Sequence, residues 1–451
     1  MTELTLNSER PTNSERPTHW LFSPIVKTLF LAIVVATMFF SEHDVDMSAL
    51  DSFVAEIEDQ ESWASGGSAL RRIVFLGCAV IGVFSLLLER GKSFRFNLPI
   101  ALIITYLLWA GASVTWSIDA GTTVRRFVLV VCCAIGCFGF CKLIDVRDAV
   151  FAAMLVSVGY LGLGITAELL LGTFRPHVGE YRFAGSMHPN IQAANLAIGC
   201  IAAYTMARVK PKFKTIFYGI FGLLFLFLIM TKCRSATASV PVSLGFIWLA
   251  SQPVRNIVLG LVSGFWLLSC TCLVCIALDY NPILDNSNVL LLGRQEETGA
   301  SLTGRFPLWE DLGEYVWLRP WTGYGFKAFW NPRHIADIAV SQEWVISEAH
   351  SSYVDTTLQL GIVGTALLSL AGLSVFFFSA ITYRRTLQPG YLFLIGGVTF
   401  CIVRGFTESG LNGASSITAF IYLALVAHSW NGDRRPPEAE NNPSDPLSQI
   451  A

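Results

Sequence analysis

The stretch SEAHSSYVDTTLQLGIVG (347–364) opens with a carboxylate, a histidine and two serines and then becomes apolar. Its apolar part continues to about residue 379, which exceeds the roughly 20 residues that a helix needs to cross a bilayer. The stretch therefore predicts a membrane-spanning helix whose entrance carries Glu348 and His350. Ionisable groups are costly near a bilayer and usually have a function there, so this histidine needs an explanation.

The composition indicates a polytopic membrane protein. Of the 451 residues, 53% are hydrophobic and 14% are charged, and the mean hydropathy is +0.54. Ordinary soluble domains carry about 25% charged residues. The formal net charge of −2 provides no polycationic surface, so we expect no nucleic-acid partner.

Hydropathy along the chain predicts an all-α fold, a polytopic transmembrane helical bundle of about 12 spans. The signal is poorest at 236–251, which is short, and at 97–115, which carries Pro99. The predicted spans are 24–40, 71–88, 97–115, 125–141, 147–171, 190–207, 215–232, 236–251, 256–279, 353–379, 388–406 and 414–430.

Lysine placement predicts that both termini lie in the cytoplasm. In this orientation Lys232 and Lys327 fall outside, whereas the other lysines fall inside. The expected organisation is a disordered cytoplasmic tail (1–23), transmembrane helices 1–9 (24–279), a large, partly helical periplasmic loop (280–352), transmembrane helices 10–12 (353–430) and a cytoplasmic tail (431–451).

We expect neither a metal site nor a cofactor. Cys270, Cys272 and Cys275 lie in a uniformly apolar segment without a histidine or carboxylate, so these thiols fit helix packing better than zinc binding. Asp44 and Asp46 have the spacing of a metal-binding pair but lack a strand-like segment before them.

Arginines gather on the predicted outer face. Arg182, His188 and Asn190 lead into an apolar helix, Arg234 lies in a tight turn, and Arg305 lies in the large loop. Arginine keeps its charge and binds phosphate in a bidentate manner, although helix-end arginines also reach for lipid headgroups. Asn190 suits a helix cap as well as a substrate contact.

Four tryptophans of the large loop fall within about twenty residues: Trp309, Trp317, Trp321 and Trp330. These side chains fit either an aromatic belt at the membrane interface or a surface that recognises sugars. A short amphipathic helix is expected around 309–316. The following Gly323-x-Gly325 indicates a compact turn and lacks the third glycine of a dinucleotide-binding loop.

His350 is the candidate catalytic base. An unperturbed imidazole has a pKa near neutrality and can take a proton from a hydroxyl. Arg182, Arg234, Arg305 and His188 lie on the same predicted side of the membrane. A pocket of positive charge around one base suits a lipid diphosphate whose glycosyl group is attacked by a hydroxyl.

Several polar segments follow one another in a recognisable order: RFAGSMHPNIQAANLA (182–197), CRSA (233–236), TGRFPLW (303–309), RPWTGYGFKAFW (319–330) and AHSSYVDTTLQLGIVG (349–364). In this order they resemble the O-antigen ligase/polymerase superfamily, most closely its exopolysaccharide-polymerase branch. VRGFTESGL (403–411) is also similar to that branch, so the resemblance covers about 180–411.

Members of this superfamily are integral membrane glycosyltransferases that use polyprenyl-diphosphate-linked sugars at the periplasmic face, invert the anomeric centre and use no metal. The resemblance implies that His350 deprotonates the acceptor hydroxyl. It also implies that Arg234 and Arg305 hold the donor diphosphate, with Arg182 as a third arginine.

The chain departs from the family at one position beside the histidine. Family members commonly have asparagine there, where this chain has Ser351. Ser352 or Tyr353 would then have to supply the contact that the amide makes.

Further residues are expected to bind substrate around this site. Glu348 could tune His350, cap the helix or face water, and the sequence leaves these roles open. The expected substrate-binding residues are Arg182, His188, Asn190, Trp309, Tyr324, Glu348, Tyr353, Arg404 and Glu408, beside the catalytic His350, Arg305 and Arg234.

The expected function is the polymerisation of polyprenyl-diphosphate-linked oligosaccharide repeats into exopolysaccharide or O-antigen at the bacterial inner membrane. The alternative is a ligase that transfers a finished glycan to lipid A core. A transporter or lipid flippase would show mid-bilayer charges and repeats between halves, which this sequence lacks. A receptor or scaffold role stays open. Expected partners are the lipid-linked donor, a glycan or lipid A core acceptor, membrane lipid, a flippase and a chain-length regulator.

Overall fold

In the computed structural model the chain folds into α-helices, and no strand occurs among the residues that the structure describes. These residues are 69–87, 94–178, 181–253, 255–260, 305–342, 346–413 and 416–430, with the single positions 32, 36 and 266. The chain is therefore all-helical over this part, as predicted.

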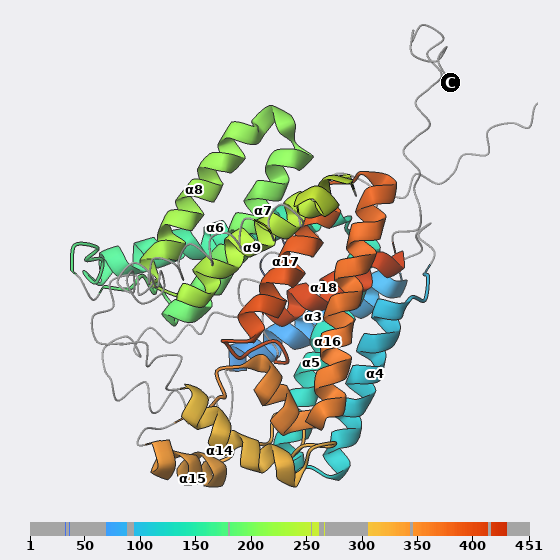
Figure 1. The fold of residues 1–451 in the computed structure, drawn as a ribbon, viewed down its shortest axis with the longest axis vertical. Helices are drawn as coiled ribbons and strands as arrows, with labels where there is room; N and C mark the ends of the chain where they lie inside the picture. The colour runs from blue at the N-terminus through green and yellow to red at the C-terminus, as the bar shows by residue number, and fades with distance from the viewer. Residues whose placement is uncertain are drawn as a thin grey trace, which may run out of the picture.

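Most of the helices follow the apolar runs of the sequence, and Figure 1 shows how they are arranged in space. Short 3₁₀ turns, Ser113–Thr115 and Pro211–Phe213, extend or precede two of them. In chain order the α-helices are α3 (Ala69–Leu87), α4 (Leu98–Ala112), α5 (Ala120–Leu143), α6 (Val146–Leu170), α7 (Pro189–Val209), α8 (Lys214–Met230), α9 (Arg234–Ala250), α14 (Arg305–Leu318), α15 (Pro332–Gln342), α16 (Ser352–Thr386), α17 (Gly390–Gly405) and α18 (Ser416–Trp430).

Among the described residues, 5 helices are long and apolar enough to cross a membrane: Leu98–Thr115, Ala120–Leu143, Val146–Leu170, Pro211–Met230 and Ser352–Thr386. Each coincides with a predicted span. Arg72–Leu87, Gly390–Gly405 and Phe420–Trp430 are shorter apolar helices. The spans expected at 24–40 and 256–279 lie mostly outside the described residues, so the total of 12 remains a prediction.

Helix α7 is apolar but lies inside the bundle, surrounded by other helices. Leu196 and Cys200 are fully buried, and α7 packs against α6, α8, α9 and α17. Small residues allow the close approach, because a Cβ added at Gly199 would lie 2.4 Å from Cβ of Ser157. The Ser157 hydroxyl donates to the Asn195 carbonyl at 2.7 Å, which joins α6 to α7. Hydropathy alone could not distinguish such a central helix from one that faces lipid.

Helix α16 is broken nine residues after its start. Gly361 has φ 68° and ψ −175°, a conformation essentially restricted to glycine. The hydroxyls of Thr357 and Thr365 lie 2.8 Å apart across the break. Residues eight positions apart in a straight helix are separated by about 12 Å along its axis, so the chain bends sharply at Gly361.

The loop between α14 and α15 supplies the hydrogen bonds that this break removes from α16. The backbone N–H groups of Tyr324 and Gly325 donate to the carbonyls of Leu358 and Gln359 at 2.8 and 2.9 Å. In return, the Ile362 N–H donates to the Pro320 carbonyl at 2.8 Å. In addition, the indole of Trp109 on α4 donates to the Leu360 carbonyl at 3.0 Å. Unsatisfied backbone groups are costly in a bilayer, so these contacts make the break tolerable.

Helices α14 and α15 lie together at one end of the bundle, beside the ends of α5 and α16 (Figure 1). They share a second apolar core, which includes Leu308, Leu312, Phe329, Ile338 and Leu358. Leu358 comes from α16, so this core also joins the loop to the break.

Replacing Gly361 with alanine should destabilise the protein by about 2–4 kcal/mol, because the backbone conformation disfavours any Cβ. The added atom would also lie 2.1 Å from the Trp321 carbonyl oxygen. Thermal unfolding of the purified full chain in detergent would measure the loss. Gly372→Ala, in the same helix, is the matched control because its nearest contact would be at 3.8 Å. Equal melting temperatures for both variants would show that the break needs no glycine.

Candidate active site

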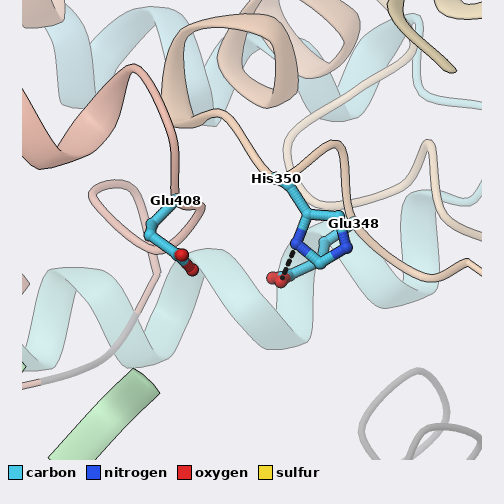
Figure 2. A group of neighbouring side chains, drawn as sticks. All are labelled: Glu348, His350 and Glu408. Atoms are coloured by element: carbon cyan, nitrogen blue, oxygen red, sulfur yellow. Dashed lines mark ion pairs between the residues drawn. The ribbon is translucent and has the colours of Figure 1, made fainter. Parts of the chain in front are cut away.

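The candidate site lies where several chain segments meet. His350 and Glu348 precede α16, and Glu408 follows α17. Figure 2 shows the carboxylate of Glu408 pointing toward the His350–Glu348 pair from the opposite side. One atom from each of the three side chains lies within 4.8 Å of the others. Segments that are distant in sequence therefore form a single charged cluster.

Glu348 is the direct partner of His350. Oε1 of Glu348 lies 3.0 Å from Nδ1 of His350, and the two side chains are 46% and 25% exposed. Burial by itself lowers the pKa of His350, but the hydrogen bond and negative charge of Glu348 outweigh it, so the pKa is raised above 6.5. Burial likewise raises the pKa of Glu348, yet the contact with His350 outweighs it and the pKa is lowered. Of the roles left open for Glu348, the geometry fits tuning His350.

Two tryptophans of the large loop hold the histidine segment in place. The indole of Trp309 donates to the Ala349 carbonyl at 2.8 Å, and that of Trp330 donates to the Asp355 carboxylate at 2.7 Å. Asp355 also accepts from the Ala349 N–H at 3.2 Å. These bonds fix the backbone around His350, which has a φ of 49°. A left-handed backbone is uncommon for histidine, and such residues are found at functional sites.

The four tryptophans therefore separate into two pairs. The indoles of Trp309 and Trp330 make hydrogen bonds within the protein, whereas Trp317 and Trp321 are 82% and 65% exposed. The two interpretations of the tryptophans, an aromatic belt at the membrane interface and a surface that recognises sugars, therefore apply only to Trp317 and Trp321.

Glu408 lies among groups that carry positive charge or donate hydrogen bonds. Its Oε1 lies 3.5 Å from a terminal nitrogen of Arg305 and 3.5 Å from the Ser235 hydroxyl. The amide nitrogen of Asn190 lies 3.4 Å from its Oε2. The side chain is only 7% exposed. The Glu408 carbonyl is held firmly, because it accepts from the N–H and hydroxyl of Ser352 at 3.1 and 2.8 Å.

Arg182 approaches the same cluster through Asn190. Its guanidinium donates to the Asn190 side-chain oxygen at 2.9 Å and to the Thr231 carbonyl at 3.0 Å. The buried carboxylate of Glu168 fixes the turn that carries Arg182. It accepts from the N–H groups of Ala184 and Gly185 at 2.9 and 2.8 Å and from the Tyr181 hydroxyl.

The remaining predicted arginines also lie at the converging helix ends. Arg404, near the end of α17, is 5% exposed and donates to the Asn190 carbonyl at 3.4 Å. Arg234 is the first residue of α9, directly before Ser235. The Arg305 guanidinium also donates to the Thr407 carbonyl.

Other predicted substrate-binding residues use their polar atoms for structure. The Tyr324 hydroxyl donates to the Tyr315 carbonyl at 3.0 Å inside the second core. His188 caps α7 by accepting from the Asn190 N–H at 3.3 Å. The Tyr353 hydroxyl donates to the Ile402 carbonyl at 3.0 Å. Ser351 likewise donates to the Gly405 carbonyl at 3.4 Å. Ser351, Ser352 and Tyr353 thus hold residues 402–411 in place.

Sequence reasoning missed Asp355, Glu168 and Ser235 as contributors to the site. The first two carried a visible signal, since each is a carboxylate inside an apolar run, and such groups are usually paired or functional. Ser235 had no comparable signal, because hydroxyls are common at helix starts.

The Glu348, His350 and Glu408 donors have a spacing that a divalent cation could use. However, the Arg305 guanidinium lies 3.5 Å from Glu408 and already supplies positive charge there. The arrangement therefore favours charge neutralisation by arginine, and the absence of a metal requirement remains a prediction.

Comparison with known families supports the assignment made from the motifs. A family model described as O-antigen ligase matches residues 219–369, a segment that contains Arg234, Arg305 and His350. The match supports the O-antigen ligase/polymerase superfamily and a membrane enzyme of the glycosyltransferase type in O-antigen or polysaccharide assembly. No curated protein matches the chain.

Glu348→Gln should lower the pKa of His350, because the hydrogen bond and charge that raise it come first from Glu348. NMR titration of histidine-labelled full-length protein would measure this value, with His350→Gln identifying the resonance among the 7 histidines. Glu310→Gln, at an exposed position on α14, is the control and should leave the value unchanged. An unchanged His350 pKa in Glu348→Gln would contradict the pairing.

Proposed function

We propose that the protein is a membrane glycosyltransferase that polymerises polyprenyl-diphosphate-linked oligosaccharide repeats at the periplasmic face of the bacterial inner membrane. The observation that carries the proposal is the Glu348–His350 pair, 3.0 Å apart, beside the cluster of Arg305 and Glu408. It combines a base that a carboxylate supports with an arginine that can bind an anion, and this transfer needs both groups.

In the proposed reaction, Nε2 of neutral His350 takes the proton of an acceptor hydroxyl. The hydroxyl oxygen forms a bond to the anomeric carbon of the donor from the face opposite the diphosphate. The bond from that carbon to the diphosphate oxygen breaks, and the diphosphate leaves with the electron pair. One bond forms and one breaks at the opposite face, so the anomeric centre is inverted.

Glu348 supports this role of His350 in two ways. Its carboxylate lies 3.0 Å from Nδ1 and so favours the tautomer that carries the proton on Nδ1, which leaves Nε2 as the proton acceptor in the neutral ring. It then stabilises the imidazolium that proton transfer creates, because the two side chains are already in ion-pair distance.

The arginines meet the other requirement. A diphosphate is a good leaving group near neutral pH and needs its negative charge balanced more than it needs a proton. We propose that Arg305, Arg234 and Arg182 bind the diphosphate and that Arg404 adds positive charge next to Asn190. The contacts of Arg182 with Asn190, and of Arg404 with the same residue, support a common location.

The acceptor decides between polymerase and ligase. VRGFTESGL (403–411) and HPNIQAAN (188–195) favour a polymerase by resemblance, and transfer to lipid A core is the alternative. A transporter or lipid flippase is the second alternative. A flippase and a chain-length regulator would act before and alongside a polymerase. In this scheme residues 280–352 form the periplasmic loop and both terminal tails, 1–23 and 431–451, are cytoplasmic.

Purified protein should elongate polyprenyl-linked repeat units in buffer that contains EDTA, and His350→Ala should reduce the rate by about 10²–10⁴-fold, the contribution of a general base. Product length on gels would measure both. His177→Ala, at an exposed position, is the control and should keep the rate. Transfer that requires added lipid A core would identify a ligase instead, and full activity of His350→Ala would refute the base assignment.

Arg305→Lys should lower kcat/KM by at least about tenfold, because lysine keeps the charge but loses the bidentate fork. The same elongation assay would measure it, with Arg333→Lys at an exposed position of α15 as the control. Near-normal kinetics for Arg305→Lys would assign Arg305 a structural role.

A further inference from the structure

The carboxylate of Glu408 is surrounded by donors that it reaches only loosely. Its contacts with Arg305, Ser235 and Asn190 are 3.4–3.5 Å long. Charge-assisted hydrogen bonds to a carboxylate are normally about 2.7–2.9 Å. The ring of donors is therefore wider than a carboxylate needs, and a larger anion could contact all of these groups at normal distances.

Helix ends add to the attraction for an anion at this position. Asn190 is the second residue of α7 and Ser235 is the second residue of α9. Helix N-termini carry partial positive charge and unpaired N–H groups, which favour phosphate. Here such ends converge on the position of one carboxylate.

Arg404 provides an independent indication of a missing ligand. It is 5% exposed, yet its Nε has no hydrogen-bond partner, and its contact with the Asn190 carbonyl is long, at 3.4 Å. A buried guanidinium with an unused donor is costly unless an anion completes its bonding. Through Asn190, Arg404 borders the same ring of donors.

We propose that the position of the Glu408 carboxylate is the binding subsite for a phosphoryl group, and that Glu408 is a built-in anion that this group displaces. The identity of the ligand, the donor diphosphate, rests on the proposed function. The subsite consists of Arg305, Asn190 and Ser235, with Arg404 behind Asn190.

The backbone of Glu408 permits such a displacement. Ser352 fixes its carbonyl, and the Glu408 N–H donates to the Arg404 carbonyl at 2.9 Å, so only the side chain has to rotate. An anion of low charge competes poorly with a carboxylate that is already in place. Glu408 therefore selects a diphosphate over the single phosphates of ordinary lipid headgroups, which are abundant in the same membrane.

Glu408→Gln removes the competing charge while it keeps the shape of the side chain. Full-length protein in phosphatidylcholine nanodiscs should then bind inorganic pyrophosphate about tenfold more tightly than the unchanged protein, as measured by calorimetry. Glu310→Gln, exposed on α14, is the matched control and should not change the affinity. Arg305→Gln added to Glu408→Gln should abolish the gain.

Weaker or unchanged pyrophosphate binding by a folded Glu408→Gln variant would overturn the proposal, as would a gain that survives Arg305→Gln. Thermal unfolding of each variant identifies the folded ones, and Glu408→Asn offers a second neutral variant if Glu408→Gln unfolds. Pyrophosphate binding needs no glycosyl transfer. A tenfold gain in a protein that transfers no sugar would therefore uphold the subsite and refute the proposed function.

Discussion

The break in α16 is the constraint on which the rest of the site depends. A helix interrupted within an apolar segment leaves backbone carbonyls and N–H groups without partners, and a bilayer offers none. Residues 320–325 provide those partners. Because this loop connects α14 to α15, its attachment also sets the position of α14, whose first described residue is Arg305. One set of backbone hydrogen bonds thus helps to position both the candidate base, His350, and the candidate diphosphate-binding residue, Arg305.

Charge balance is the second feature of the site. The carboxylates of Glu348 and Glu408 both lie close to His350, and the guanidinium of Arg305 lies 3.5 Å from Glu408. Glu348 is committed to the imidazole, whereas Glu408 is only loosely held by its donors. The two carboxylates therefore differ in function: Glu348 pairs with His350, whereas Glu408 lies among the donors around Arg305. In the sequence both are simply acidic residues near the membrane.

Hydropathy and motif order predicted the all-helical fold, several spans and the segments that the structure brings together at the candidate site. They could not predict contacts between residues far apart in the chain, such as Glu408 with Asn190 and Ser235. They also could not distinguish Trp309 and Trp330, whose indoles make hydrogen bonds within the protein, from the exposed Trp317 and Trp321. All four tryptophans lie in similar local sequence. Tyr324 and His188 have polar groups suited to substrate, and only packing shows that these groups hold the fold.

The attachment of residues 320–325 to α16 also imposes an order on the maturation of the protein. These residues precede α16 in the chain, so they emerge from the ribosome before the helix they complete. Until the loop has folded, the carbonyls at Leu358 and Gln359 stay without partners in an apolar environment. A chain whose loop has not yet folded therefore carries an unfinished helix, and folding of the loop completes α16 in the same step that assembles the candidate site.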